Sequence, residues 1–316
     1  MDKIPGLTEI KRAHTRISKY IEETPVLFSN SINEMVGAKV FFKCENFQRG
    51  GSFKMRGATN MIMGFTPEER RNGFATHSSG NHAQAVALAA SLTGSKAYVV
   101  MPKDSSRVKI DAVKEYGAEI TFCEPTEQAR KKACDEIIEK TGAVFVPPFD
   151  DYRIIAGQAT AAKELIEEVH ELDYVISPVG GGGLAAGTAI SASCLDPTIK
   201  VLLGEPKNAD DTFQSLKAGK IKGVKNPNTI ADGLKTTIGQ KNFEIIQNYV
   251  EEVITVEEEE IISAMKLIWE RMKIIIEPSC AVAFAAVLKV KERFAGKRVG
   301  VILTGGNVDV TNLPFK

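Results

Sequence analysis

The chain has 316 residues, which is long enough to bury a large core and predicts two subdomains rather than one. Its 40 basic and 40 acidic residues cancel, and the isoelectric point is near 6.9. The net charge therefore gives no reason to expect nucleic acid or an acidic membrane surface as a partner. We expect the partner to be a small molecule.

The cysteines and the N-terminal segment indicate a cellular compartment. Five cysteines, at positions 44, 123, 134, 194 and 280, are odd in number and lack C-x-x-C spacing, which is typical of reduced thiols rather than of a disulfide framework. Residues 1–20 are charged and lack the apolar core of a signal peptide, and no apolar run approaches the length of a membrane span. The sequence therefore predicts a soluble cytoplasmic protein.

Short apolar runs of strand length recur along the chain. They occupy residues 40–43, 74–77, 97–101, 120–123, 144–147, 174–179, 201–204, 252–256 and 299–303. Segments with helical periodicity lie between most of them, at residues 83–92, 127–140, 159–169 and 258–272. This alternation, with strands that are apolar throughout, predicts an α/β fold whose parallel sheets are covered on both faces.

The first candidate functional residue is Lys54, in the segment 52–57 with the sequence Ser-Phe-Lys-Met-Arg-Gly. Residues 53–64 are expected to form a short helix with Ser52 as its N-cap. The positive end of the helix dipole would disfavour the ammonium form of Lys54, so its amine would be available as a nucleophile. A lysine of this kind is a candidate to form an imine with an aldehyde cofactor. The alternative is a solvated lysine on a helix face.

Four consecutive glycines, at positions 180–183, follow the apolar run 174–179 and precede a helical segment. A loop of this kind directs backbone N–H groups outward, and the dipole of the following helix favours a phosphate. A packing turn in a parallel sheet is the structural alternative. Gly181, Gly183 and Ala186 also fit a dinucleotide-binding fingerprint, with Glu205 as the ribose-binding acid.

Lys54 and the glycine run together resemble the fold-type II pyridoxal-phosphate enzymes. The segments that carry this resemblance are 52–57 (Ser-Phe-Lys-Met-Arg-Gly), 78–82 (Ser-Ser-Gly-Asn-His), 180–183 (Gly-Gly-Gly-Gly) and 304–307 (Thr-Gly-Gly-Asn). The chain is most similar to the branch of serine racemases and serine/threonine dehydratases. The segments that indicate this branch are 123–125 (Cys-Glu-Pro), 155–158 (Ile-Ala-Gly-Gln), 205–211 (Glu-Pro-Lys-Asn-Ala-Asp-Asp), 230–233 (Ile-Ala-Asp-Gly) and 269–273 (Trp-Glu-Arg-Met-Lys).

The resemblance implies an α/β fold like that of the tryptophan synthase β subunit, with two three-layer domains built on parallel sheets. The large domain would consist of residues 1–72 and 150–316, with a small domain of residues 73–149 inserted into it. Pyridoxal 5'-phosphate would lie in the cleft between the domains. The resemblance to the racemases also implies a homodimer. Because the chain stops soon after residue 307, we expect no C-terminal regulatory domain and no feedback control by an amino acid.

The resemblance implies an enzyme that interconverts L- and D-serine and also dehydrates serine to pyruvate and ammonia. Racemisation needs a proton donor on each face of Cα, and Lys54 serves one face. The racemases resemble this chain in having a serine at position 79, so Ser79 would be the second acid/base. Threo-3-hydroxyaspartate ammonia-lyases share this serine, and a lyase for L-threonine or threo-3-hydroxyaspartate is the alternative. A third hypothesis is an NAD-dependent or non-catalytic dinucleotide-binding protein.

Further site residues follow from the same resemblance. The cofactor would be held by Lys54, Phe53, Asn81, Gly180, Gly181, Gly182, Gly183, Leu184 and Thr304. The substrate would be held by Ser78, Ser79, Gly80, Asn81, His82 and Arg130. Thr304 stands where many relatives have serine, and its hydroxyl would donate to the pyridine nitrogen. As structural alternatives, the two serines are helix caps, Arg130 is solvated and Thr304 belongs to a turn.

A structural cation site and a nucleotide site are also implied. Glu205, the carbonyl of Ala209 and Asp211 supply hard oxygen ligands for Mg²⁺, Ca²⁺ or Mn²⁺, and a solvated acidic loop is the alternative. Gln84, Tyr116, Lys273 and Asn307 match the positions that bind ATP as an effector at the racemase dimer interface. The neighbouring pair Arg49-Gly50 departs from the Lys-Thr of the animal enzymes. Lys273 is alternatively a cation that complements the end of a helix.

Overall fold

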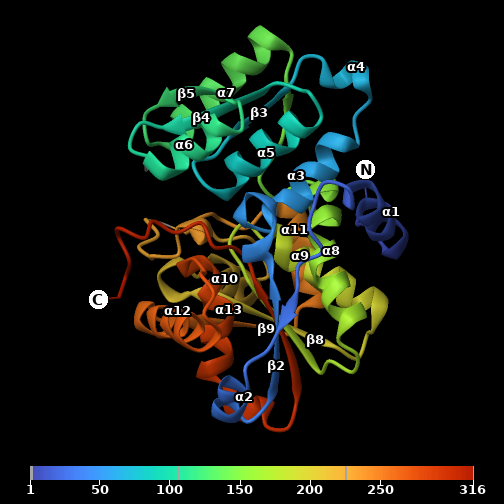
Figure 1. Cartoon of the computed structure of the whole chain (residues 1–316), viewed down its shortest axis with the longest axis vertical. Helices are drawn as coiled ribbons and strands as arrows, with labels where there is room; N and C mark the ends of the chain where they lie inside the picture. Colours follow the sequence, from blue (N-terminus) through green and yellow to red (C-terminus); the bar gives the residue numbers. More distant parts are fainter. Residues whose placement is uncertain (1–2, 106, 225, 316) are drawn as a thin grey trace.

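The computed structural model describes residues 3–105, 107–224 and 226–315. Its strands form two separate sheets, which Figure 1 shows one above the other with helices on their faces. The four-stranded sheet comes from one continuous part of the chain, between Phe74 and Phe145, whereas the six-stranded sheet uses strands from before and after it. This arrangement agrees with the expected insertion of a small domain, although the boundaries at residues 73 and 149 stay a prediction.

The six-stranded sheet has the order β1-β2-β10-β7-β8-β9, and all its neighbouring strands are parallel except β1 and β2. Its strands are β1 (Val26–Leu27), β2 (Lys39–Cys44), β7 (Tyr174–Pro178), β8 (Lys200–Pro206), β9 (Glu252–Val256) and β10 (Arg298–Leu303). The pattern of apolar runs predicted all of them except β1, which is only two residues long. Parallel strands buried on both faces read as continuous apolar runs, which explains the agreement.

Two layers of helices cover the six-stranded sheet. Buried side chains of α2, α12 and α13 pack on one face, and those of α8, α9 and α11 pack on the other. The helices of this part are α1 (Leu7–Ile17), α2 (Asn30–Val36), α3 (Lys54–Met63), α8 (Tyr152–Glu168), α9 (Gly183–Leu195), α10 (Asp211–Ala218), α11 (Gln240–Tyr249), α12 (Glu258–Met272) and α13 (Pro278–Lys289). Short 3-10 turns are η1 (Glu45–Phe47), η2 (Arg49–Gly51), η3 (Lys207–Ala209), η4 (Asp232–Leu234) and η5 (Lys291–Phe294).

The four-stranded sheet has the order β5-β4-β3-β6 and is entirely parallel. Its elements are β3 (Phe74–His77), β4 (Ala97–Pro102), β5 (Glu119–Cys123) and β6 (Val144–Phe145), with α4 (Pro67–Arg70), α5 (Asn81–Leu92), α6 (Arg107–Glu115) and α7 (Glu127–Thr141). Side chains of α3, α5 and α6 form one buried cluster, and those of α7 form another. The expectation of strands buried on both faces is wrong for β5, an edge strand in which Phe122 is 45% exposed.

The predicted start of the helix that carries Lys54 needs one correction. The helix begins at Lys54, and its N-cap is Phe53, which makes no side-chain cap hydrogen bond. Ser52 is the residue before this N-cap, and it pairs with Gly305 in an isolated antiparallel bridge. The first turn of this helix is therefore tied to the chain that follows β10.

Loops that carry the predicted site residues follow β3, β7 and β10. In a parallel sheet, the carboxyl ends of the strands share one edge. Hydrogen bonds connect segments that belong to the two sheets. Asn81 Nδ2 donates to Glu277 Oε1 at 2.7 Å, and Asn307 Nδ2 donates to Asn81 Oδ1 at 2.9 Å. The start of α5 thus meets the start of α13 and the segment after β10.

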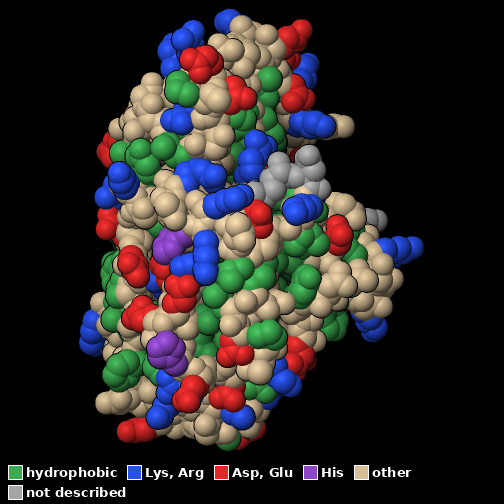
Figure 2. Space-filling model, turned by 90° about the vertical axis from the view of Figure 1, so that its right-hand side faces the viewer, with side chains coloured by type: hydrophobic (Ala, Val, Ile, Leu, Met, Phe, Trp, Pro, Cys, Tyr) green, Lys and Arg blue, Asp and Glu red, His purple; other side chains and the backbone are tan. Residues whose placement is uncertain are grey.

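Charged side chains of both signs are interspersed over the face of the molecule that carries α1 (Figure 2). This distribution agrees with the zero net charge of the sequence and with a small-molecule partner. Of the helices that the structure describes, none combines the length and the apolar character that a membrane span requires.

Candidate active site

Lys54 is held where two distant parts of the chain run side by side. The backbone N–H of Phe53 donates to the carbonyl of Thr304 at 3.0 Å, next to the bridge between Ser52 and Gly305. These contacts place the first residue of α3 beside the carboxyl end of β10. Lys54, which is expected to bind the cofactor covalently, and Thr304, which is expected to contact its ring nitrogen, therefore lie on adjacent segments.

The Lys54 amine is half-buried and donates a hydrogen bond to the carbonyl of Pro148 at 2.9 Å. Burial lowers the pKa of this amine to about 8, and the nearby carboxylate of Glu277 opposes the shift. The sequence argument attributed a lowered pKa to the helix dipole, but the largest cause in the structure is desolvation. The free amine, which is the nucleophilic form, is therefore a larger fraction of Lys54 at neutral pH than of an exposed lysine.

The tetraglycine run forms the turn between β7 and the N-terminus of α9. Gly182 is the N-cap of α9 and has a positive φ of 94°, a conformation that favours glycine. A Cβ at Gly180 would lie 2.9 Å from Leu234 Cα, and one at Gly181 would lie 2.2 Å from the ring of Phe149. The loop is thus bare backbone at the start of a helix, which is the arrangement that binds phosphate.

Two neighbours fix the shape of this loop. The carbonyl of Gly181 accepts hydrogen bonds from the backbone N–H of Gly239 at 3.1 Å and from Asn242 Nδ2 at 2.7 Å. Because this carbonyl is turned toward α11, the peptide N–H groups at the start of α9 are left to bind a ligand. Leu184, which was expected to contact the cofactor, is buried in the core beneath the loop.

Thr304 is buried, with 3% of its surface exposed, directly after the last residue of β10. Its carbonyl is used by Phe53, so the segment that carries its hydroxyl is fixed beside the start of α3. Lys54, Thr304 and the glycine loop thus offer an amine, a hydroxyl and a phosphate cradle. This donor set fits pyridoxal 5'-phosphate, whose aldehyde, ring nitrogen and phosphate need these three kinds of partner.

The serines of the segment 78–82 are not helix caps. The N-cap of α5 is Gly80, which makes no side-chain cap hydrogen bond. Ser78 Oγ instead accepts a weak hydrogen bond from the N–H of Gly80 at 3.4 Å, and Ser79 is half-buried in the same turn. The capping alternative is therefore wrong for both residues, and the turn leaves the first N–H groups of α5 to bind a carboxylate.

His82 is buried in the first turn of α5 and is held as the neutral imidazole. Its Nε2 lies 3.0 Å from the carbonyl of Val146, which can only accept, so Nε2 carries the proton. Burial, followed by the charge of Lys54, lowers the pKa of His82 to about 3. A histidine with this pKa is not a base at neutral pH, which agrees with an orienting role.

Glu277 belongs to the site although no sequence motif pointed to it. It is the N-cap of α13, is 5% exposed and accepts from Asn81 Nδ2. Burial raises its pKa to about 8, and Asp232 adds to the shift. The signal in the sequence is a single acid between the apolar residues 274–276 and Pro278. Asn81 is thus bound to both Glu277 and Asn307, which orients the amide expected to reach the cofactor ring.

Arg130, in α7, lies near His77, the residue that precedes the segment 78–82. Its charge helps burial to lower the pKa of His77, the last residue of β3, whose ring stacks on Phe145 with centroids 5.2 Å apart. The half-buried Arg130 has a buried Nε with no hydrogen-bond partner within the described part of the chain. Its position therefore agrees with the expected ability to meet an acidic ligand.

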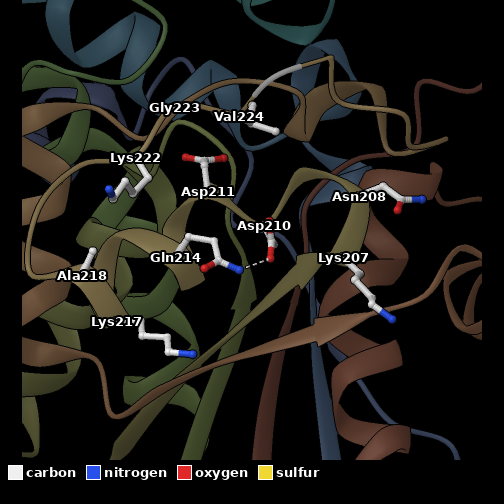
Figure 3. A pocket seen from close by; sticks show the side chains of 10 residues that line it. All are labelled: Lys207, Asn208, Asp210, Asp211, Gln214, Lys217, Ala218, Lys222, Gly223 and Val224. Carbon is white, nitrogen blue, oxygen red and sulfur yellow. Dashed lines mark hydrogen bonds between the residues drawn. The ribbon is translucent and has the colours of Figure 1, made fainter.

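The three predicted cation ligands lie in one short stretch of the chain, from Glu205 in β8 through Ala209 in η3 to Asp211 at the start of α10. Glu205 and Asp211 are 0% and 2% exposed, and burial raises their pKa values to about 8 and about 6. Asp211 Oδ2 accepts from the N–H of Ile238 at 2.8 Å, whereas the buried Oδ1 has no partner among the described residues. Asp211 lines a cavity of about 640 Å³ beside Asp210 and Lys222 (Figure 3).

Two buried carboxylates with raised pKa values and an orphaned oxygen fit a divalent cation, which would stabilise their charged forms. Both oxygens of Glu205 accept from backbone N–H groups, of Thr212 at 2.9 Å and of Phe213 at 2.8 Å. Each Glu205 oxygen keeps a second lone pair for a cation, and a Glu205 that binds a cation is not available to a ribose, as the dinucleotide hypothesis requires. In the part of the chain that is described, no three His, Cys, Asp or Glu side chains cluster as a metal site, so carbonyl and water ligands would complete this one.

The predicted nucleotide residues are brought together only in part. Asn307 bonds to Asn81 and to the carbonyl of Gly50 at 2.8 Å, and Gln84 is buried one turn further along α5. Tyr116 packs against the same cluster of α5 and α6. Lys273 is the exposed C-cap of α12 with a positive φ of 60°, as the helix-end alternative described.

Comparisons with known proteins agree with this geometry. The family model described as "Pyridoxal-phosphate dependent enzyme" matches residues 17–305. The serine racemase of Dictyostelium discoideum is 51% identical over 97% of this chain and 96% of its own length. The beta-hydroxyaspartate dehydratase of Paracoccus denitrificans is 47% identical, with 99% of each protein covered. The solved structure of maize serine racemase has a TM-score of 0.96 at 42% identity and covers 98% of this chain and 95% of that chain.

The matched range contains Lys54, the glycine loop and Thr304, which are the three parts of the site that fit the cofactor. The resemblance inferred from the sequence is therefore confirmed, and with it the fold class. This chain belongs to the family of pyridoxal-phosphate-dependent enzymes.

Proposed function

We propose that this protein is a serine racemase that interconverts L- and D-serine and also dehydrates serine to pyruvate and ammonia. The observation that carries the proposal is Ser79, a half-buried hydroxyl that is not a helix cap, in the turn before α5. The same turn leads into Asn81 and His82, whose side chains interact with the surroundings of Lys54. The similarity to the Dictyostelium racemase supports this assignment.

The chain's own residues divide the work of binding. Lys54 would attach the cofactor covalently, the N–H groups of Gly180 to Gly183 would hold its phosphate, and Thr304 would donate to its ring nitrogen. When bound, the cofactor withdraws electron density from the Cα of the amino acid, so the Cα proton becomes acidic. The N–H groups at the start of α5, with Ser78 and Gly80, would bind the substrate carboxylate.

Two groups would then move the proton at Cα. In the L-to-D direction, Lys54 takes the Cα proton on one face as its free amine, and Ser79 Oγ–H delivers a proton to the other face. Solvent then restores the proton of Ser79, and Lys54 releases the one it took. In the reverse direction the two roles exchange. The lowered pKa of Lys54, about 8, suits an amine that must both accept and return a proton near neutral pH.

Dehydration needs only the Lys54 face. After Cα loses its proton, the β-hydroxyl of serine leaves with a proton as water, and hydrolysis of the remaining product yields pyruvate and ammonia. This reaction needs no donor on the opposite face. The two activities of one site can therefore be separated by changing Ser79.

A second candidate is an ammonia-lyase for threo-3-hydroxyaspartate or L-threonine. It is favoured by Arg130, whose unpartnered Nε lies near the substrate segment and suits a second carboxylate. The similarity to the beta-hydroxyaspartate dehydratase of Paracoccus denitrificans supports the same idea.

Chiral analysis of the products from L-serine, L-threonine and threo-3-hydroxyaspartate would decide between the candidates. The racemase proposal requires D-serine from L-serine at a rate comparable to that of pyruvate formation. Pyruvate without D-serine, together with much faster turnover of threo-3-hydroxyaspartate, would favour the lyase. Arg130→Leu would then abolish the preference for the acidic substrate while leaving serine turnover within a fewfold of the parent.

A divalent cation would be bound by Glu205, the Ala209 carbonyl and Asp211. The observation that supports this is the buried Asp211 Oδ1 without a partner. Because η3 and α10 carry two of the three ligands, the cation would fix the chain after β8. Mg²⁺, Ca²⁺ and Mn²⁺ all accept this set of oxygen ligands.

We also propose a cytoplasmic homodimer with ATP as an effector. Phe47 and Ile275 are 47% and 51% exposed, and they are connected because Asn46 Nδ2 donates to the carbonyl of Ile275 at 3.1 Å. Covering such apolar side chains favours association. Sedimentation tests the homodimer, and a monomer at micromolar concentration would contradict it. Activity assays with and without ATP test the effector, and unchanged activity in ATP would contradict it.

A further inference from the structure

Arg56, two residues after Lys54 in α3, has every donor of its guanidinium engaged although its side chain is fully buried. Its Nε and Nη2 donate to the two carboxylate oxygens of Glu45 at 2.7 and 2.8 Å. Its Nη1 and Nη2 donate to the two oxygens of Glu164 at 2.6 and 2.7 Å, and Nη1 also donates to Thr160 Oγ1 at 3.1 Å. A guanidinium has five N–H donors, and these five bonds use them all.

The charges around Arg56 balance within the interior. Lys43, which is 0% exposed, lies 2.7 Å from Glu164 Oε2 and donates to the carbonyl of Thr24 at 2.5 Å. Two buried cations thus face two buried carboxylates. Such a network rarely adds stability over apolar side chains of the same volume, because desolvation offsets the attraction. The contribution of this network to folding stability therefore does not explain why it is present.

The network instead fixes the position of α3. It joins β2 through Lys43, η1 through Glu45 and α8 through Glu164. Gly57, the next residue of α3, is also held by α8, because its N–H donates to Gln158 Oε1 at 3.2 Å. The N-cap of α3 makes no side-chain hydrogen bond, so the guanidinium supplies the anchor that a capping side chain supplies in other helices.

We propose that Arg56 is a positioning residue for Lys54: its bidentate bonds to Glu45 and Glu164 fix the first turn of α3 and so hold the Lys54 amine against the Pro148 carbonyl. The inference rests on the proposed role of Lys54 as the residue that carries the cofactor. It assigns a purpose to a buried charged network that takes no direct part in the proposed proton transfers.

Arg56 would act on Lys54 through the position of the amine and not through the charge of the guanidinium. Burial and the carboxylate of Glu277 determine the pKa of the Lys54 amine. The charge of Arg56 is neutralised at contact distance by two carboxylates, so it adds little at Lys54. A change at Arg56 that preserves its charge therefore alters the Lys54 amine only by moving it.

Arg56→Lys tests this in the cofactor-free protein. Lysine keeps the charge but cannot form two parallel pairs of bonds to two carboxylates. The pH dependence of reductive methylation at Lys54, read by peptide mass mapping, is expected to have a parental midpoint near the pKa of about 8. In the variant we expect the midpoint to rise by about one pH unit or more as the amine becomes more solvated. With cofactor bound, kcat should fall about tenfold or more.

Two further variants make the result decisive. Ile268→Val removes a methyl group from the core of α12, on the opposite side of the six-stranded sheet from α8, and serves as a matched destabilising control. Thr160→Val removes one acceptor of Arg56 but leaves both ion pairs, so it tests the network if Arg56→Lys does not fold. We expect a smaller upward shift for Thr160→Val and none for Ile268→Val.

A folded Arg56→Lys or Thr160→Val protein with the parental midpoint would overturn the proposal. So would an equal shift in Ile268→Val, because the network would then act only through stability. Failure of the underlying function looks different: borohydride reduction of the parent with its cofactor would then label a lysine other than Lys54. The methylation midpoint is measured without the cofactor and remains a separate result.

Discussion

At the level of single residues, the environment of Lys54 explains its proposed reactivity. Its amine is half-buried against the Pro148 carbonyl, and burial lowers its pKa to about 8. An exposed lysine, with a pKa near 10.4, would be almost entirely protonated at neutral pH. The surroundings that make the amine nucleophilic are thus supplied by residues far from it in the sequence.

We expect Lys54→Ala to abolish covalent attachment of the cofactor and to reduce turnover of serine by several orders of magnitude. The fold should persist, because the amine contacts one carbonyl and is not part of a packed core. Visible absorbance after reconstitution and the melting temperature of the cofactor-free protein measure these two effects. Retained turnover with the normal absorbance band would show that another lysine carries the cofactor.

Lys54 could be proposed from the sequence as the reactive lysine, but its neighbours in the structure could not. Lys54, the glycine run and Thr304 follow motifs of adjacent residues. The structure places Lys54 beside Thr304 and Pro148, and the glycine run beside Phe149. Glu277 was missed because a single acid before a proline has no distinctive spacing, and its role depends on a contact with Asn81, the first residue of α5. Ser52 was misassigned as a cap because its pairing with Gly305 is long-range and has no local signal.

At the level of elements, the turn from β7 into α9 would determine whether the proposed phosphate site can form. The ring of Phe149, which follows β6, packs directly against this turn. The N-terminus of α9 therefore presents its N–H groups from a loop that has no room for side chains.

Gly181→Ala should weaken cofactor binding by about tenfold or more, because the loss of one hydrogen bond to a charged group costs about 1.5–3 kcal/mol. Its added Cβ would lie 2.2 Å from Phe149, so the loop or the ring must shift. Gly117→Asn is the control, since Gly117 has a positive φ that asparagine tolerates and open space around it. Fluorescence titration with pyridoxal 5'-phosphate measures the affinities, and parental affinity in Gly181→Ala would mean that the phosphate binds elsewhere.

Element boundaries show what local patterns can supply. The runs that predicted β3, β9 and α12 coincide with the observed bounds, because strong periodicity or continuous apolar character marks both ends. The start of α8 was predicted seven residues too late, at residue 159 instead of Tyr152. The N-cap of α8 is Asp151, whose side chain accepts from the N–H of Arg153, and this capping signal was overlooked.

At the level of the whole molecule, the cation site links stability to pH. The carboxyl groups of Glu205 and Asp211 have pKa values raised by burial to about 8 and about 6 from ordinary values of 4.5 and 3.8. A raised pKa means that the contribution to stability is present at low pH and is lost as pH rises through the folded-state value. Without a cation, the melting temperature should therefore fall as pH increases between about 4 and about 8.

A divalent cation should reverse this trend, because it binds the ionised carboxylates of the folded state. At a hundred times its dissociation constant it would add about 2.7 kcal/mol. Thermal melts in chelator and in excess Mg²⁺, across this pH range, measure the effect. Asp211→Asn should remove most of the difference between the two conditions. Identical melting curves with and without the cation at every pH would show that residues 205–211 form only a buried loop.

The central claim is that protons reach Cα from two faces, and it is tested most directly by the reactions of Ser79→Ala with each enantiomer of serine. We expect D-serine formation from L-serine to fall about a hundredfold or more, as for the loss of a general acid, while pyruvate formation from L-serine stays within a fewfold of the parent. D-serine should become nearly inert as a substrate, because its Cα proton lies on the Ser79 face. Interconversion of the enantiomers at the parental rate would contradict this account.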